Sequence, residues 1–197
     1  MSKSERLSIL YSRYKEKFDK EEIVTGDGNS NSLLLLIGEA PGKDEVLKSK
    51  PFVGKAGKNL AQFLEILELK REDIYITNAI KYRLSKVNAN TGRTSNRPAT
   101  RREIEQNREY LIEEIDIINP KYIVTLGNVP LRSVLGDYKV SIGCKHGVID
   151  KVILKDNEYG LYPLYHPASI IYNVSLKDVY LKDIENLSKL LELSYKI

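Results

Sequence analysis

The stretch LLLLIGEAPG at residues 33–42 decides the fold, because five apolar residues lead directly into a loop of glycine and proline. An apolar run of this length, ended by Gly38, is typical of a strand that is buried on both faces of a sheet. Further segments rich in β-branched, aromatic or leucine residues predict strands at residues 74–80, 122–126 and 161–165.

Helical patterns separate these strands. Apolar residues recur at helical spacing from Leu60 to Leu67, and from Ile104 to Ile118 after Thr100, a favourable N-cap residue. A last helix is predicted at about residues 176–193 and an opening helix at about residues 4–18. This alternation predicts an α/β fold, a three-layer α/β/α sandwich with a largely parallel four-stranded central sheet.

Composition bounds the function without deciding it. The chain has 197 residues, 42% of them hydrophobic and 29% charged, which suits a single soluble domain over residues 1–197. No apolar run approaches the ~20 residues that span a bilayer, and the N-terminal segment lacks a signal-peptide core, so we expect a cytoplasmic protein without membrane contact. The net charge of +4 is compatible with a polyanionic partner but is common in proteins without one.

Polar residues and glycines stand where each predicted strand ends. Gly38 and Glu39 follow the first strand, Asn78 lies near the end of the second, Gly127 follows the third and His166 the fourth. Ligands of parallel α/β sheets bind beyond the carboxyl ends of the strands, so a site is expected there. The first loop has neither a Walker lysine nor the GxGxxG spacing, which argues against a P-loop or a Rossmann site.

Six short motifs, taken together, carry a resemblance to a known family. In this order and at this spacing the chain resembles the type-four branch of the uracil-DNA glycosylase superfamily, over about residues 23–185. Such enzymes remove uracil in base-excision repair, so the resemblance implies uracil-containing DNA as the partner. The motifs are GEAPG at 38–42, PFVGKAG at 51–57, ITNAIK at 76–81, NRP at 96–98, IVTLG at 123–127 and YHPAS at 165–169.

The resemblance implies roles for two residues that hold the base. Phe52 matches the aromatic residue that stacks on the extruded base, although a core phenylalanine near a turn is the alternative. Asn78 matches the residue that reads the base edge, where its amide can donate to uracil O4 and accept from N3–H. Cytosine cannot satisfy the same orientation. An asparagine that merely caps the strand end is the alternative for Asn78.

The resemblance also implies the chemistry. His166 matches the histidine that contacts uracil O2 as negative charge develops, and Glu39 is expected beside the sugar and the attacking water. Gly38 and Ala40 would supply backbone around the same point. Uracil leaves as a stabilised anion, so hydrolysis through an oxocarbenium-like sugar needs few groups. No lysine is placed as an imine-forming nucleophile, so a monofunctional glycosylase that leaves an abasic site is predicted.

Two departures from relatives concern the first motif. In the best-known branch of the superfamily this motif carries an Asp that positions water and a Tyr that excludes thymine. The corresponding positions here are Ala40 and Gly42, so water activation would fall to Glu39 or to backbone groups. Another branch traps the sugar covalently through a histidine before the PFVG stretch. Residues 43–50 contain no histidine, so that chemistry is not expected.

Type-four enzymes usually hold an iron–sulfur cluster with four cysteines, and this chain has only Cys144. The resemblance places the four ligand positions at Tyr11, Tyr14, Tyr82 and Asn107, none of which can serve as the expected thiolate. No cofactor and no metal are therefore expected. We hypothesise that aromatic packing replaces the cluster.

Contacts with DNA are predicted on two loops. Residues 84–100 are expected to form an irregular loop within a basic stretch that has no acid from residue 83 to residue 102. Arg93 and Arg97 are its candidate phosphate contacts, although a solvated flexible loop is the alternative. After His166 the family pushes an apolar side chain into the gap left by the flipped base. Ile170 or Ile171 is the candidate wedge, unless both simply begin the packing of the last helix.

Two other functions remain open at this point. A DNA-binding member of the superfamily with weak or no catalysis would keep the pocket without turnover, but the presence of Glu39, Phe52, Asn78 and His166 favours the enzyme. An α/β enzyme acting on free nucleotides is disfavoured by the missing phosphate-binding lysine motif. In each case a monomer is expected.

Overall fold

A computed structural model describes residues 1–195, except for the side chains at 55, 170–172, 174 and 193–195. Within this part, the central sheet has six strands in the order β1-β3-β2-β6-β8-β7. The inner four strands are parallel, and β1 and β7 are antiparallel edges. Their bounds are Asp27–Gly28 for β1, Leu34–Gly38 for β2, Tyr75–Asn78 for β3, Tyr122–Leu126 for β6, Asp150–Leu154 for β7 and Asn157–Leu164 for β8.

The predicted largely parallel sheet is confirmed, and its four predicted strands are the inner four. The sheet has two more strands than the four predicted, because the edge strands β1 and β7 contain no long apolar run. Strand β1 has only two residues, and in β7 only Val152 and Leu154 point into the core while the other residues are exposed. Edge strands of this kind carry a weak hydrophobic signal.

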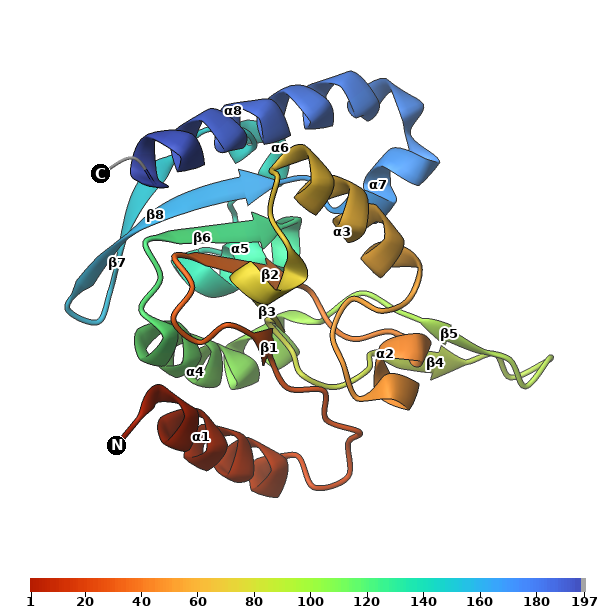
Figure 1. Cartoon of the computed structure of the whole chain (residues 1–197). Helices are drawn as coiled ribbons and strands as arrows, with labels where there is room; N and C mark the ends of the chain where they lie inside the picture. Colours follow the sequence, from red (N-terminus) through yellow and green to blue (C-terminus); the bar gives the residue numbers. More distant parts are fainter. Residues whose placement is uncertain (196–197) are drawn as a thin grey trace.

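Helices cover both faces of the sheet, which confirms the three-layer sandwich (Figure 1). Alternate side chains of β2 serve opposite cores, with Leu35 and Ile37 on one face and Leu34 and Leu36 on the other. The first face is covered by α4 and α5, with α1 packed beside α4; the second is covered by α3 and α8. The bounds are Lys3–Lys17 for α1, Lys55–Ile66 for α3, Arg101–Ile118 for α4, Asn128–Leu135 for α5 and Lys177–Tyr195 for α8.

Helix starts follow local capping chemistry. Ser2 caps α1 and Thr100 caps α4, each in a reciprocal capping box with the glutamate three residues later. The predicted N-cap at Thr100 is therefore confirmed. None of the described helices is both long and apolar enough to pass through a membrane.

The segment predicted as an irregular loop at residues 84–100 instead contains a β-hairpin, which projects from the body of the molecule (Figure 1). Its strands are β4, Ser85–Val87, and β5, Thr94–Asn96. The side chain of Asn88 accepts hydrogen bonds from the amides of Asn90 and Thr91 and so closes the turn. All six strand residues are exposed, so no apolar alternation reveals the hairpin in the sequence.

Short helical segments complete the described chain. They are α2 at Lys43–Lys48, η1 at Arg71–Asp73, α6 at Ile142–Lys145, α7 at Pro167–Tyr172 and η2 at Val174–Leu176. Of these, α2 and α7 directly follow the loops at the carboxyl ends of β2 and β8, and they therefore flank the candidate site.

Candidate active site

A cleft of about 700 Å³ opens at the carboxyl ends of the parallel strands. Its walls come from the loop after β2, the PFVG loop, the β4–β5 hairpin and the start of α7. Glu39, Phe52, Asn78 and His166 all line this one cleft, together with Ala40. The side chains predicted to act on one base are therefore gathered in one place.

Phe52 and Asn78 converge on Gly38. A Cβ atom at Gly38 would lie 2.5 Å from Asn78 Oδ1 and 2.5 Å from Phe52 Cζ, so only glycine lets both side chains approach this closely. Phe52 itself has a left-handed backbone with φ 53°. Arg71 secures this conformation, since its Nη1 donates to the Phe52 carbonyl at 3.2 Å. The aromatic ring of Phe52 and the side-chain amide of Asn78 therefore lie next to each other at Gly38.

Asn78 ends β3 with a side chain that is 3% exposed. Its loop is fixed to the neighbouring strand end, because the amide of Ala79 donates to the Gly38 carbonyl at 2.8 Å and the amide of Ile80 to the Glu39 carbonyl at 3.0 Å. Within the part of the chain that the structure describes, the Asn78 side-chain amide makes no hydrogen bond. An amide that lines a cleft and has no protein partner is suited to form hydrogen bonds with a ligand.

A buried ion pair lies under Asn78. Lys81 Nζ is 2.7 Å from Glu114 Oε2, both side chains are inaccessible to solvent, and Nζ also donates to the Asn78 carbonyl at 3.1 Å. Glu114 further accepts hydrogen bonds from the hydroxyls of Tyr11 and Thr77. This lysine is committed to its partners and is closed to substrate, so it acts as support beneath the site.

His166 lines the cleft, and a backbone contact fixes its tautomer. Its Nδ1 accepts a hydrogen bond from the Ala168 amide at 3.1 Å, as the N-cap of α7. Burial lowers the pKa of His166, which favours the neutral ring. Because Nδ1 is an acceptor, the neutral ring carries its proton on Nε2. The outcome is a fixed N–H donor without a full positive charge.

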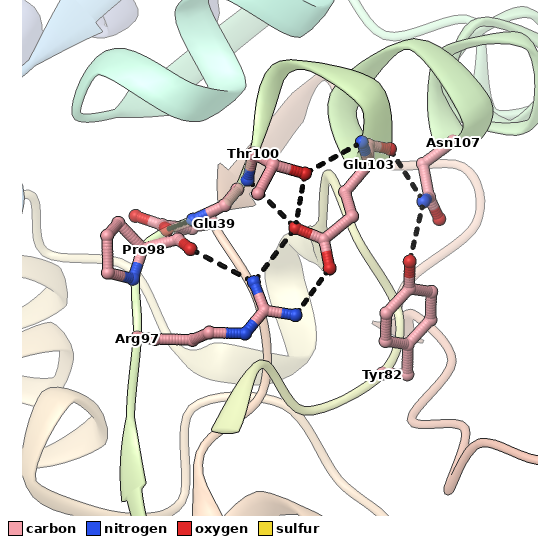
Figure 2. A network of polar contacts seen from close by, with 8 residues as sticks. Glu39, Tyr82, Arg97, Pro98, Thr100, Glu103 and Asn107 are labelled. Carbon is pink, nitrogen blue, oxygen red and sulfur yellow. Dashed lines mark hydrogen bonds and ion pairs between the residues drawn. The ribbon is translucent and has the colours of Figure 1, made fainter. Parts of the chain in front are cut away.

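Glu39 follows β2 at the edge of the same cleft. Its Oε1 accepts a hydrogen bond from the Ala99 amide at 3.1 Å. Figure 2 draws Glu39 with the network of Arg97 and Glu103. Burial raises the pKa of Glu39, and the Ala99 hydrogen bond acts in the opposite direction. A carboxylate at this position can stabilise a developing cation or accept a proton from water.

Sequence reasoning missed Glu45, a buried carboxylate that joins two walls of the cleft. Its Oε2 accepts from the Gly42 amide at 3.0 Å, while its Oε1 accepts from the amides of Val53 and Gly54 at 3.1 and 2.7 Å. Glu45 thereby connects the loop after Glu39 to the loop of Phe52. An acid three residues after Gly42, the N-cap of α2, was the available signal, as in a capping box.

Three of the four positions expected at the cluster ligands, Tyr14, Tyr82 and Asn107, form one polar and aromatic cluster. The Tyr14 hydroxyl donates to Asn107 Oδ1 and accepts from the Lys81 amide, while Asn107 Nδ2 lies 3.3 Å from the Tyr82 hydroxyl. Tyr14 also packs on Phe18 at 4.6 Å between ring centroids. Tyr11 stands apart from the other three and joins the Glu114 network. These residues offer no thiolate, and no described group of His, Cys, Asp and Glu could hold a metal ion.

The predicted DNA contacts differ in their surroundings. Arg93 is exposed at the hairpin and has no ionic partner among the described residues. Arg97 instead forms a bidentate ion pair with Glu103, with nitrogen–oxygen distances of 2.6 and 2.9 Å. Ile170 and Ile171 belong to α7, but their side chains lie outside the described residues.

Fold and site together define an α/β protein with a cleft beyond the carboxyl ends of a parallel sheet, lined by an aromatic ring, an asparagine, a histidine and a glutamate. A family model described as the uracil DNA glycosylase superfamily matches residues 25–188. The chain therefore belongs to the uracil DNA glycosylase superfamily.

Its similarity extends to named members of the type-4 group. The chain is 33% identical over 174 residues to the type-4 uracil-DNA glycosylase of Archaeoglobus fulgidus, covering 87% of this chain and 83% of that protein. It is 36% identical to that of Sulfurisphaera tokodaii, with coverages of 85% and 74%. It is 32% identical over 193 residues to that of Thermotoga maritima, with coverages of 93% and 94%.

Proposed function

We propose that the protein hydrolyses the N-glycosidic bond of deoxyuridine in DNA, releasing uracil and leaving an abasic site. The observation that carries this proposal is the convergence of Phe52 and Asn78 on Gly38 in the cleft that His166 and Glu39 also line. One chain supplies all of these residues, and we propose that the enzyme is a monomer.

In this proposal the base is swung out of the DNA and held by its face and its edge. The Phe52 ring stacks on the pyrimidine, and the Asn78 amide donates to O4 and accepts from N3–H. Cytosine presents an amino group and an unprotonated nitrogen at the same positions, so it would leave the amide mispaired in a buried site. The closeness of Phe52 and Asn78 supports simultaneous contact with one ring.

Bond cleavage then relies on two groups that are already oriented. The Nε2–H of neutral His166 would donate to uracil O2, where negative charge grows as the bond breaks. The Glu39 carboxylate would favour the oxocarbenium-like sugar and guide the attacking water. The carboxylate must be ionised for both tasks. Burial raises the pKa of Glu39, and the Ala99 hydrogen bond opposes that shift by stabilising the ionised form.

The decisive experiment is incubation of the purified protein with a uracil-containing oligonucleotide, followed by alkali to cleave at abasic sites. Cleavage is expected with uracil and not with matched thymine or cytosine oligonucleotides. Strand cleavage before alkali would contradict the monofunctional mechanism. Tight binding of uracil-containing DNA without turnover would instead favour an inactive, DNA-binding member of the superfamily. Release of uracil from free deoxyuridine, but not from the oligonucleotide, would favour an enzyme that acts on small molecules.

Phosphate contact is proposed for Arg93 on the exposed hairpin. Replacing it in Arg93→Gln is expected to lower the slope of log affinity against log salt by about 0.9, the value for one phosphate contact in duplex DNA. Fluorescence anisotropy with a uracil-free duplex measures this slope. Lys189→Gln, an exposed cation on α8, is the control and should leave the slope unchanged. Equal slopes for Arg93→Gln and wild type would remove the hairpin from the DNA interface.

We propose that Tyr14, Tyr82 and Asn107 replace the iron–sulfur cluster as a packed structural unit. Purified protein is then expected to be colourless and free of stoichiometric iron. Tyr14→Phe leaves Asn107 Oδ1 and the Lys81 amide without their partner, at a cost of about 1–3 kcal/mol in the free energy of unfolding.

The matched control is Tyr110→Phe, a ring in the same aromatic cluster, whose hydroxyl has no hydrogen bond within the described residues. Its expected cost is within about 0.5 kcal/mol. Urea unfolding compares the two variants. Equal stabilities would show that aromatic packing alone, without the hydrogen bonds, fills this region.

A further inference from the structure

Arg97 of the basic stretch forms a bidentate ion pair with Glu103, at the start of α4. The guanidinium meets the carboxylate as a fork, with Nη1 at 2.9 Å from Oε2 and Nη2 at 2.6 Å from Oε1 (Figure 2). Nη1 also donates to the carbonyl of Pro98 at 3.2 Å. Hydrogen bonds from Arg97 lower the pKa of Glu103 to about 2, so the pair is fully charged at neutral pH.

Glu103 is fixed from its other side by the start of α4. Its Oε2 accepts from the amide and the hydroxyl of Thr100, both at 2.8 Å, in the capping box of the helix. The backbone between Arg97 and Thr100 is therefore tied at both ends to one carboxylate. Pro98 stiffens the same turn, because its ring restricts φ.

The only residue between Pro98 and Thr100 is Ala99, whose amide donates to Glu39 Oε1 at 3.1 Å. This is the one hydrogen bond that the Glu39 carboxylate receives from the described residues. Figure 2 draws Glu39 together with Pro98, Thr100 and the Arg97–Glu103 pair. The position of the Ala99 amide thus determines where the Glu39 carboxylate points in the cleft.

We propose that Arg97 and Glu103 are positioning residues, whose ion pair holds Ala99 so that its amide orients Glu39 toward the reacting sugar. This inference rests on the proposed glycosylase function, in which Glu39 acts on the sugar or the water. It gives Arg97 a role different from the phosphate contact expected from its charge. The guanidinium fork that would grip a phosphate is already occupied by Glu103.

The arrangement continues to the region of the replaced cluster. Asn107 Nδ2 donates to the Glu103 carbonyl at 2.8 Å and contacts the Tyr82 hydroxyl at 3.3 Å (Figure 2). The first turn of α4 is thereby anchored on two sides. The rigid support of Glu39 consequently extends from the hairpin to the buried cluster of Tyr14, Tyr82 and Asn107.

The test compares Arg97→Lys, which keeps the charge but loses the fork, with wild type on a uracil-containing duplex. A displaced carboxylate is expected to lower kcat by about 10- to 100-fold, while KM and the salt dependence of DNA binding stay unchanged. Glu103→Gln should lower kcat in the same way, because it removes the ion pair with Arg97. Glutamine retains the capping box, so the start of α4 is preserved in this variant. Arg101→Gln, which breaks the exposed pair with Glu105 on the same helix, is the matched control and should keep full kcat.

A double-variant comparison separates positioning from DNA contact. If Arg97 acts through Glu39, adding Arg97→Lys to Glu39→Gln lowers kcat no further. A phosphate contact would instead raise KM, flatten the salt dependence and multiply the loss of Glu39→Gln. Either that result or an unchanged kcat in Arg97→Lys overturns the proposal.

Amide hydrogen exchange provides a readout that does not need activity. Loss of the bidentate Arg97–Glu103 contact should raise the exchange rate of the Ala99 amide by about tenfold. This factor corresponds to about 1.4 kcal/mol, the size of one hydrogen bond. Wild-type protein without glycosylase activity would contradict the proposed function, yet this measurement would still decide whether the pair holds Ala99. Unchanged exchange at Ala99 in both Arg97→Lys and Glu103→Gln overturns the inference.

Discussion

Asn78→Ala is expected to reduce the rate of uracil release by about 100- to 1000-fold while the protein folds normally, because two hydrogen bonds to the base are lost in a buried site. Stability should be preserved, since the Asn78 amide has no hydrogen-bond partner within the described part of the protein. Alkali cleavage of a uracil oligonucleotide measures the rate, and thermal unfolding measures the stability.

Asn78→Asp and Asn186→Ala sharpen this experiment. Aspartate has the same shape but cannot donate to O4 when ionised, so a loss of activity shows that the donor, rather than the volume, matters. Asn186 is exposed on α8 and its truncation should change nothing. Full activity of Asn78→Ala would exclude Asn78 as the reader of the base.

The inner architecture could be predicted from the sequence because buried parallel strands have strong local signals. The apolar runs that became β2 and β6 are covered on both faces, so every position had to be apolar or small. Thr100 likewise indicated the start of α4, because capping depends on neighbouring residues alone. The hairpin of β4 and β5 carries no such signal, since its residues face solvent and its turn is closed by one asparagine.

The residues that line the candidate site could be predicted from the sequence, but the residues that hold them in place could not. Motifs point to Glu39, Phe52, Asn78 and His166, and the fold brings all four to one cleft. The ion pair of Arg97 was not visible because residues 83–102 contain no acid, and its partner Glu103 is the next residue after that window. A run of one charge in the sequence therefore does not reveal which charges are paired in space.

The second large effect is expected on stability, from the buried ion pair of Lys81 and Glu114 beneath Asn78. Glu114→Ala is expected to lower the free energy of unfolding by about 3–5 kcal/mol, because it leaves the Lys81 ammonium unpaired in the protein interior. The hydroxyls of Tyr11 and Thr77 lose their acceptor in the same variant. Urea unfolding followed by circular dichroism measures the loss.

The neighbouring residue Glu113 is the matched control, since it pairs with Arg13 on the exposed side of the same helix. Glu113→Ala should cost within about 1 kcal/mol, as is usual for surface ion pairs. The double variant Lys81→Met, Glu114→Gln removes both charges and keeps an acceptor for the hydroxyls, so it should recover much of the loss. If Glu114→Ala were no more costly than Glu113→Ala, the ion pair would not be what supports the loop of Asn78, and the backbone bonds of Ala79 and Ile80 would have to hold it alone.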